Sequence, residues 1–231
     1  ATPLVLQDLM CFGDKSGAVT CLRPDGTVAW QVHPGKGPCR ARIVAADMTD
    51  GHVLIAPLGT SLCFLTLDGS VKWPRHFSDS HPDGQMLATP MFVKHRAFEI
   101  VLCGVDDVLY ALAPQGNVLW QRKISSTLDS TIALMPRGDL EPLILCQGLW
   151  GNLHAFDLHG KPVWTHLFRS KSRTQPVVAD VNGDGEQAGV SPPESAAFCE
   201  ALRPVFDPRR ARDGDPYEVL VGPEGRIRQF R

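Results

Sequence analysis

The sequence predicts an all-β fold, a β-propeller of four-stranded antiparallel blades with about four full blades and a partial fifth. The first observation is a recurring phrase in which a turn glycine precedes a short apolar strand that ends in tryptophan. Its four copies end at Trp30, Trp73, Trp120 and Trp164. These tryptophans lie about 45 residues apart, within the period of one propeller blade. The second observation is that each repeat holds strand-length apolar runs bounded by Gly, Asp or Pro, and none of the first four repeats reads as a helix.

The repeats divide one predicted domain, residues 1–231, into blades at approximately 1–30, 39–73, 86–120, 131–164 and 174–231. The fifth repeat holds three strands and lacks the fourth, which would end in tryptophan. Residues 187–217 differ in character and contain Pro192-Pro193 and Asp215-Pro216, so they are predicted to be an inserted loop. We therefore expect an open or incomplete propeller, or a fragment of a longer one. Exposed sheet edges at its two ends would favour association.

Composition limits the classes of partner. Of the 231 residues, 43% are hydrophobic and 21% are charged, and the formal net charge is −2. This balance is ordinary for a globular protein and gives no reason to expect a nucleic-acid partner. No apolar run reaches 18 residues, so membrane insertion is not predicted.

The seven cysteines show no spacing typical of a zinc site. When the repeats are overlaid, Cys11, Cys103 and Cys146 fall at one position of the second strand, where the fifth repeat has Val221. A cysteine that alternates with valine is expected to be a small buried hydrophobe, with redox or metal chemistry as the alternative. Free core cysteines and the absence of an Asn-x-Ser/Thr sequon favour a reducing compartment, and we predict a cytoplasmic location.

One stretch has the pattern of a metal site. Asp180, Asn182 and Asp184 offer side-chain oxygens at alternate positions, and Glu186 would offer its carbonyl. Glycine at the sixth position lets a chain turn around Ca²⁺, which takes about six to eight oxygen ligands. The ninth position is an alanine, but Glu218 takes its place if the insertion loops out. The alternative is an Asx-rich turn that binds nothing. The shorter counterpart in the second repeat, residues 47–51, is predicted to be a plain turn.

Two phrases resemble known repeat families. The stretch 178–185, followed by 218–222, is similar to the FG-GAP-type repeat of integrin α-subunit propellers. The phrase from Leu109 to Trp120 is similar to the repeat of pyrroloquinoline-quinone (PQQ)-type propellers. Relatives of that type include quinoprotein dehydrogenases, outer-membrane assembly lipoproteins and the propeller of an adenylating acyl-CoA-synthetase-like protein. The resemblance implies a propeller fold, and it leaves activity open because these families use one fold for different tasks.

The function predicted from the sequence is a non-catalytic scaffold for protein–protein interaction, with Ca²⁺ as a structural ion. Three alternatives remain: part of a PQQ-dependent dehydrogenase, an accessory propeller of a larger enzyme such as the acyl-CoA-synthetase-like protein, or a glycan- or ligand-binding propeller. The dehydrogenase family uses an adjacent cysteine pair, which this sequence lacks. Trp150, the one tryptophan off the repeat register, is a candidate for stacking on a ligand or contacting a protein. No convergent acid–base set is recognisable, so no catalytic residue is predicted.

Overall fold

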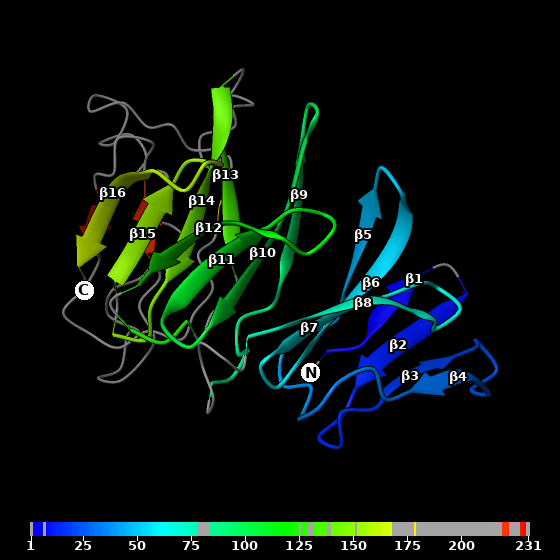
Figure 1. Ribbon diagram of the computed structural model, residues 1–231. Coiled ribbons are helices and arrows are strands. Elements are labelled where there is room, and N and C mark those ends of the chain that lie inside the picture. Colours follow the sequence, from blue (N-terminus) through cyan, green and yellow to red (C-terminus); the bar gives the residue numbers. More distant parts are fainter. Residues whose placement is uncertain are drawn as a thin grey trace, which may run out of the picture. The chain divides into compact units, whose positions relative to one another are not determined.

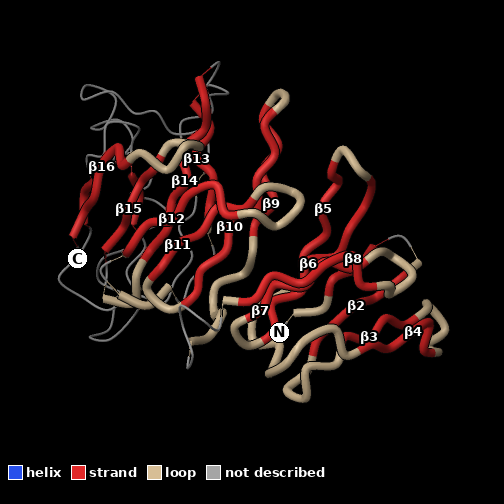
Figure 2. The backbone as a smooth tube through the Cα atoms, in the orientation of Figure 1, coloured by secondary structure: helices blue, strands red, loops and turns tan. Residues whose placement is uncertain are grey.

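The computed structural model describes residues 2–6, 8–77, 84–124, 126–128, 132–137, 140–150, 152–167, 178, 219–221 and 227–229. Within these residues the regular elements are all β-strands, shown in red in Figure 2. No helix in the described part is long and apolar enough to cross a membrane. The chain divides into two compact units, Ala1–Asp129 and Ser130–Arg231, and each is described by itself.

The first unit contains three antiparallel sheets in which each strand pairs with the next along the chain (Figure 1). The strands of the first sheet are β1 (Leu4–Leu6), β2 (Leu9–Gly13), β3 (Val19–Leu22) and β4 (Val28–Val32). Those of the second are β5 (Val44–Met48), β6 (Gly51–Leu58), β7 (Ser61–Leu65) and β8 (Val71–His76). Those of the third are β9 (Met91–His95), β10 (Phe98–Val105), β11 (Val108–Leu112) and β12 (Val118–Lys123).

The second unit contains one sheet of the same order and a separate strand pair. The strands of the fourth sheet are β13 (Ala133–Arg137), β14 (Leu140–Gln147), β15 (Asn152–Phe156) and β16 (Pro162–Leu167). The pair is β17 (Val219–Val221) with β18 (Ile227–Gln229). Val178 packs against the apolar cluster of the fourth sheet, which includes Met135 and Leu145. The predicted antiparallel four-stranded sheets are therefore confirmed, and no closed sheet occurs among the described strands.

The middle strands carry the core because they are covered on both faces. All five residues of β7 are buried, whereas β8 alternates between exposed and half-buried positions. Leu54 and Leu65 of the second sheet belong to a cluster shared with the first sheet. Ile55 and Phe64, which adjoin Leu54 and Leu65 along their strands, belong to a cluster shared with the third sheet. Period-two alternation thus sends successive side chains of one strand into two different inter-sheet cores.

The last strand of each four-stranded sheet (β4, β8, β12 and β16), which we call its outer strand, follows the same type of turn. In the first sheet the amide of Arg23 donates to the Thr27 carbonyl at 2.8 Å, and the amide of Gly26 donates to the Arg23 carbonyl at 2.9 Å. The other three turns repeat these two bonds, at Thr66, Ala113 and Asp157. A register shift follows each turn, just before the tryptophan. Glycine at positive φ followed by such a bulge is a typical hairpin connection, so this part of the repeat follows from local turn chemistry.

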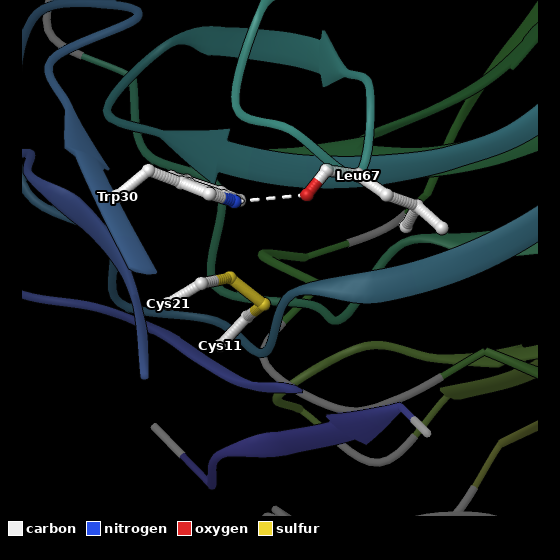
Figure 3. Close-up of a disulfide and its surroundings, with 4 residues drawn as sticks. All are labelled: Cys11, Cys21, Trp30 and Leu67. Carbon is white, nitrogen blue, oxygen red and sulfur yellow. Dashed lines mark hydrogen bonds between the residues drawn. A yellow bond between two sulfur atoms is a disulfide. The ribbon is translucent and has the colours of Figure 1, made fainter. Parts of the chain in front are cut away.

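The register corrects the overlay of the cysteines. Phe12 pairs with Thr20, just as Cys103 pairs with Tyr110, so Phe12 and not Cys11 takes the position of Cys103. Cys11 instead faces Cys21 across the strand pair and forms a disulfide with it, with the two Cα atoms 4.1 Å apart (Figure 3). The prediction that Cys11 is an unpaired core hydrophobe is wrong, because a one-residue slip moves a side chain to the opposite face.

The remaining four described cysteines are buried and unpaired: Cys39, Cys63, Cys103 and Cys146. For Cys103 and Cys146 this confirms the prediction that they are core residues.

Reduction of the disulfide is expected to lower the free energy of unfolding by about 2–3 kcal/mol, because the bridge closes a short loop in the unfolded chain. The two cysteines are separated by 10 residues. Urea unfolding with and without a reductant measures the loss. The double variant Cys11→Ala/Cys21→Ala is the control, since its stability should not respond to the reductant. If the reductant also leaves the free energy of unfolding of the unmodified protein unchanged, the expectation is contradicted.

Three expectations from the sequence stay predictions. The predicted insertion, residues 187–217, lies outside the described residues, so its loop character stays a prediction. The single-domain organisation and the proposed blade boundaries also stay predictions.

Candidate functional site: tryptophan turns and exposed apolar side chains

The repeat tryptophans join neighbouring sheets of the first unit. The indole Nε1 of Trp30 donates a hydrogen bond to the Leu67 carbonyl at 2.8 Å, as Figure 3 shows. A Cβ at Gly69 would lie 2.7 Å from the Trp30 ring, and one at Gly116 would lie 2.5 Å from the Trp73 ring. Each tryptophan therefore lies directly on the turn glycine of the next sheet. The two described contacts show that Trp30 and Trp73 pack between neighbouring sheets.

Side chains of the turns hold the same local geometry. The Asp25 carboxylate accepts hydrogen bonds from the Thr27 amide at 2.9 Å and from the Thr27 hydroxyl at 2.7 Å. The Thr27 hydroxyl bond is the main cause that lowers the pKa of Asp25 below its ordinary value. Asp68 accepts from the Ser70 amide at 3.0 Å in the equivalent place. These turns are thus held by hydrogen bonds between residues two apart in the sequence, and the side chains that make them are exposed.

The outer strands expose a recurring apolar side chain beside each tryptophan. The exposed fractions are 56% for Val28, 45% for Val71, 48% for Leu119 and 46% for Val163. Each lies one or two residues before its tryptophan, next to the register shift. An outer strand has unpaired backbone groups along one side, and a bulge limits uncontrolled pairing at such an edge. The last strand of each sheet therefore carries an exposed apolar side chain beside its register shift.

Trp150 is the most exposed indole that the structure describes. It lies after β14, before β15 begins, and 58% of the residue is exposed. Large aromatic side chains are enriched at protein interfaces because they bury much area and keep a polar group available. At the other end of β14, Leu140 is 64% exposed. The two residues place apolar surface at opposite ends of one strand, and this makes them a matched pair for mutation.

The predicted calcium ligands cannot be compared with the structure. Asp180, Asn182, Asp184, Glu186 and Glu218 all lie outside the described residues. Within the described part, no group of three or more His, Cys, Asp or Glu side chains is arranged to hold a metal ion. The calcium loop therefore stays a prediction.

The counterpart loop in the second repeat is a tight turn between β5 and β6, as predicted. It is held by a carboxylate from the third sheet. Glu99 accepts hydrogen bonds from the Thr49 hydroxyl at 2.7 Å and from the Thr49 amide at 3.2 Å. The Lys94 ammonium lies 2.7 Å from the same carboxylate, whose side chain is 9% exposed. The Lys94 and Thr49 bonds lower the pKa of Glu99 to about 2. This polar cluster ties the turn of the second sheet to the third.

Acid is expected to weaken this tie. A carboxyl whose pKa is lower in the folded state than in the unfolded chain contributes stability above its unfolded pKa, and that contribution is lost as the pH falls. For Glu99 the loss should run from about pH 4.5 to about pH 2. Urea unfolding across this window should show a shallower decline for Glu99→Gln than for the unmodified protein. Glu141→Gln is the control, and a Glu99→Gln curve parallel to that of the unmodified protein would count against the cluster.

Buried titratable groups of the core are held in neutral forms. Burial raises the pKa of Cys39 and of Cys63 to about 11 and that of Cys103 to about 12. Burial also lowers the pKa of His154, whose Nδ1 lies 3.0 Å from the Thr165 hydroxyl. Thiolate is the nucleophilic form of cysteine, so these three thiols are poor nucleophiles at neutral pH.

Sequence reasoning missed the Glu99 cluster and the disulfide. Glu99 and Thr49 are 50 residues apart, and no motif links them. A signal for the disulfide was present, since Cys11 and Cys21 lie on strands that were expected to pair. The disulfide could be recognised only with the correct register of β2 and β3.

Comparison with known proteins shows the fold. No protein-family model and no curated protein matches the sequence. Among solved structures, BamB from Moraxella catarrhalis matches with 17% identity and a TM-score of 0.53, over 75% of this chain and 53% of that chain. BBS1N, crystallised in complex with ARL6DN, matches with 16% identity and a TM-score of 0.52, over 72% of this chain and 51% of that one. The computationally designed Ika8 protein matches with 15% identity and a TM-score of 0.57, over 78% and 52%.

These neighbours are β-propellers, and the chain has the β-propeller fold that its sequence predicts. It spans about half the length of the solved structures that it matches. At such low identity the likeness shows the fold alone.

Proposed function

We propose that the protein is a non-catalytic β-propeller scaffold that binds a protein partner through exposed apolar side chains. The observation that carries the proposal is Trp150, an indole 58% exposed beside β14. Trp150 lies in a loop of the fourth sheet, one of four sheets with the same strand order. Surface loops on such a repeated frame are the usual place for binding residues.

Two further observations support this function. The buried thiols with raised pKa values are poorly suited to nucleophilic chemistry. Among the structural neighbours, BBS1N was crystallised in complex with ARL6DN, so a propeller of similar fold binds a protein. The complex of this neighbour agrees with a protein as the class of partner.

The Trp150→Ala variant is expected to lose the partner. Removal of a buried interface tryptophan costs about 2 kcal/mol or more in binding, which is roughly a thirtyfold loss of affinity. Affinity co-purification of the tagged chain from cell extract, followed by titration of the retained protein, measures it. Leu140→Ala is the matched control, since it removes an equally exposed apolar side chain at the opposite end of β14. Equal retention by the Trp150→Ala variant and the unmodified chain would contradict the role of Trp150, and failure of the unmodified chain to retain any protein would contradict the function.

We also propose that a structural Ca²⁺ ion binds the loop of Asp180, Asn182 and Asp184, with the Glu186 carbonyl and Glu218 as further ligands. The support is the alternation of oxygen donors around glycine in the sequence. The ion would join the first two strands of the fifth repeat and takes no part in chemistry.

A further inference from the structure

Three segments of the first unit pack against one another through glycines that leave no room for a side chain. They are the β2–β3 loop, residues 14–18, the β4–β5 linker, residues 33–43, and the β6–β7 turn, residues 59–60. A Cβ at Gly17 would lie 2.6 Å from the Gly37 carbonyl oxygen, and one at Gly59 would lie 2.8 Å from the Lys36 carbonyl oxygen. All three glycines have positive φ, between 55° and 92°. The backbones of the three segments are therefore in direct contact.

Two of these segments carry four exposed cationic side chains, which we call the basic patch. Its members are Lys15 in the β2–β3 loop and Lys36, Arg40 and Arg42 in the linker. The amide of Cys39 donates a hydrogen bond to the Asp14 carbonyl at 2.8 Å. Arg40 therefore leaves the linker next to the point where Lys15 leaves its loop. The contact of the two backbones brings the four charges to one place on the unit.

Buried residues alternate with the two arginines of the linker. Ala41 is 4% exposed and Ile43 is 2% exposed, and Ile43 belongs to the apolar cluster between the first and second sheets. Arg40 and Arg42 are both exposed. The buried neighbours anchor the linker to the core, so the two guanidinium groups are kept on its solvent side.

The charges of the basic patch have no counter-charge in the part of the chain that the structure describes. None of its four members forms an ion pair there, whereas Lys94 of the same unit lies 2.7 Å from Glu99. The one acidic residue of the three segments is Asp14. Its carboxylate accepts hydrogen bonds within its own loop, from Ser16 and from the Ala18 amide. Four like charges held together favour a ligand of opposite charge.

We propose that the basic patch binds an acidic segment of a partner protein, one that carries several Asp or Glu side chains. Carboxylates match the paired donors of the two guanidinium groups, and the two ammonium groups add attraction. Because the linker and the loop are already packed against each other, little backbone freedom is lost on binding. The inference rests on the proposed function for the class of partner, and it adds a second binding surface in the first unit.

Charge favours a protein segment over a polyanion such as nucleic acid. The whole chain has a formal net charge of −2, so a long polyanion that reaches beyond the patch meets net repulsion. Interfaces with nucleic acid are also larger and more positively charged than a patch of four cations. A short acidic segment covers the patch without reaching the rest of the surface.

Fluorescence anisotropy of the purified chain with a labelled peptide in which Glu and Gly alternate tests this inference. The peptide should bind, and its affinity should fall as the salt concentration rises from about 0.02 M to about 0.15 M, because exposed charges are screened. Arg40→Glu should weaken binding about tenfold, since it turns an attraction into a repulsion.

Lys72→Glu is the matched control, because it makes the same change in net charge on an exposed side chain. Lys72 lies on β8 at the end far from the β6–β7 turn, so this variant should change the affinity much less. No binding of the peptide at the lower salt concentration would overturn the inference, and so would an equal loss of affinity in the two variants. Tighter binding of a labelled DNA duplex of equal charge would also overturn it, in favour of nucleic acid.

Co-purification from cell extract separates this inference from the proposed function. Arg40→Glu should lower the amount of partner that the chain retains. A chain that binds the peptide but retains no protein contradicts the proposed function alone. Retention that Trp150→Ala abolishes and Arg40→Glu leaves intact contradicts the basic patch alone.

Discussion

Gly116→Val should lower the free energy of unfolding by about 3–5 kcal/mol. Gly116 has φ 87°, and a left-handed conformation costs an L-residue roughly 1–2 kcal/mol and a β-branched residue more. The new Cβ would also lie 2.5 Å from the Trp73 ring, where a rigid indole cannot give way. Overpacking of this kind costs about 1–3 kcal/mol in addition. Urea unfolding followed by Trp fluorescence would report both the loss and the displaced indole.

The matched control is Gly51→Val, in which the backbone cost is separated from the contact with tryptophan. Gly51 has φ 109°, and a Cβ there would meet nothing within 4 Å. Its loss should therefore be confined to the backbone cost, which for a β-branched residue exceeds roughly 1–2 kcal/mol, without the additional cost of overpacking. If Gly51→Val and Gly116→Val destabilise the protein equally, the tryptophan–glycine contact contributes nothing beyond turn geometry, and the account of inter-sheet joining fails.

Calcium should raise the stability of the protein by roughly 2.7 kcal/mol when its concentration is a hundred times the dissociation constant. The physical reason is that, at the site we propose, the ion would bind the folded loop and not the unfolded chain. For a chain of this size the thermal midpoint should rise by about 5–10 °C. Thermal unfolding with Ca²⁺ and with a chelator measures the difference.

Asp184→Ala should abolish the calcium response, because it removes one carboxylate from the loop. Asp47→Ala, in the counterpart turn between β5 and β6, should leave the response unchanged. If the thermal midpoint of the unmodified protein is the same in calcium and in chelator, the calcium proposal is wrong. The Asp180–Gly185 stretch is then a backbone turn, and the proposed scaffold needs no metal ion.

Local chemistry determined much of this protein from sequence alone. The turn at Asp25-Gly26 and its three copies follow from glycine at positive φ and from side-chain bonds within a few residues. The tryptophan that ends each copy marks the period, so the strand order of each sheet was predictable. Leu65 and Leu112, which hold the same position in two repeats, are both fully buried.

Tertiary structure decided what depends on register and on distant contacts. Cys11 pairs with Cys21 because the first hairpin is one residue out of step with the overlay, and a slip of one residue exchanges the two faces of a strand. Glu99 reaches Thr49 only because the third sheet lies against the second. Leu54 and Val101 are fully buried because each lies in an apolar cluster shared with a neighbouring sheet. Sequence specifies each sheet through short-range bonds, whereas the surface left for binding is set by how the sheets cover one another.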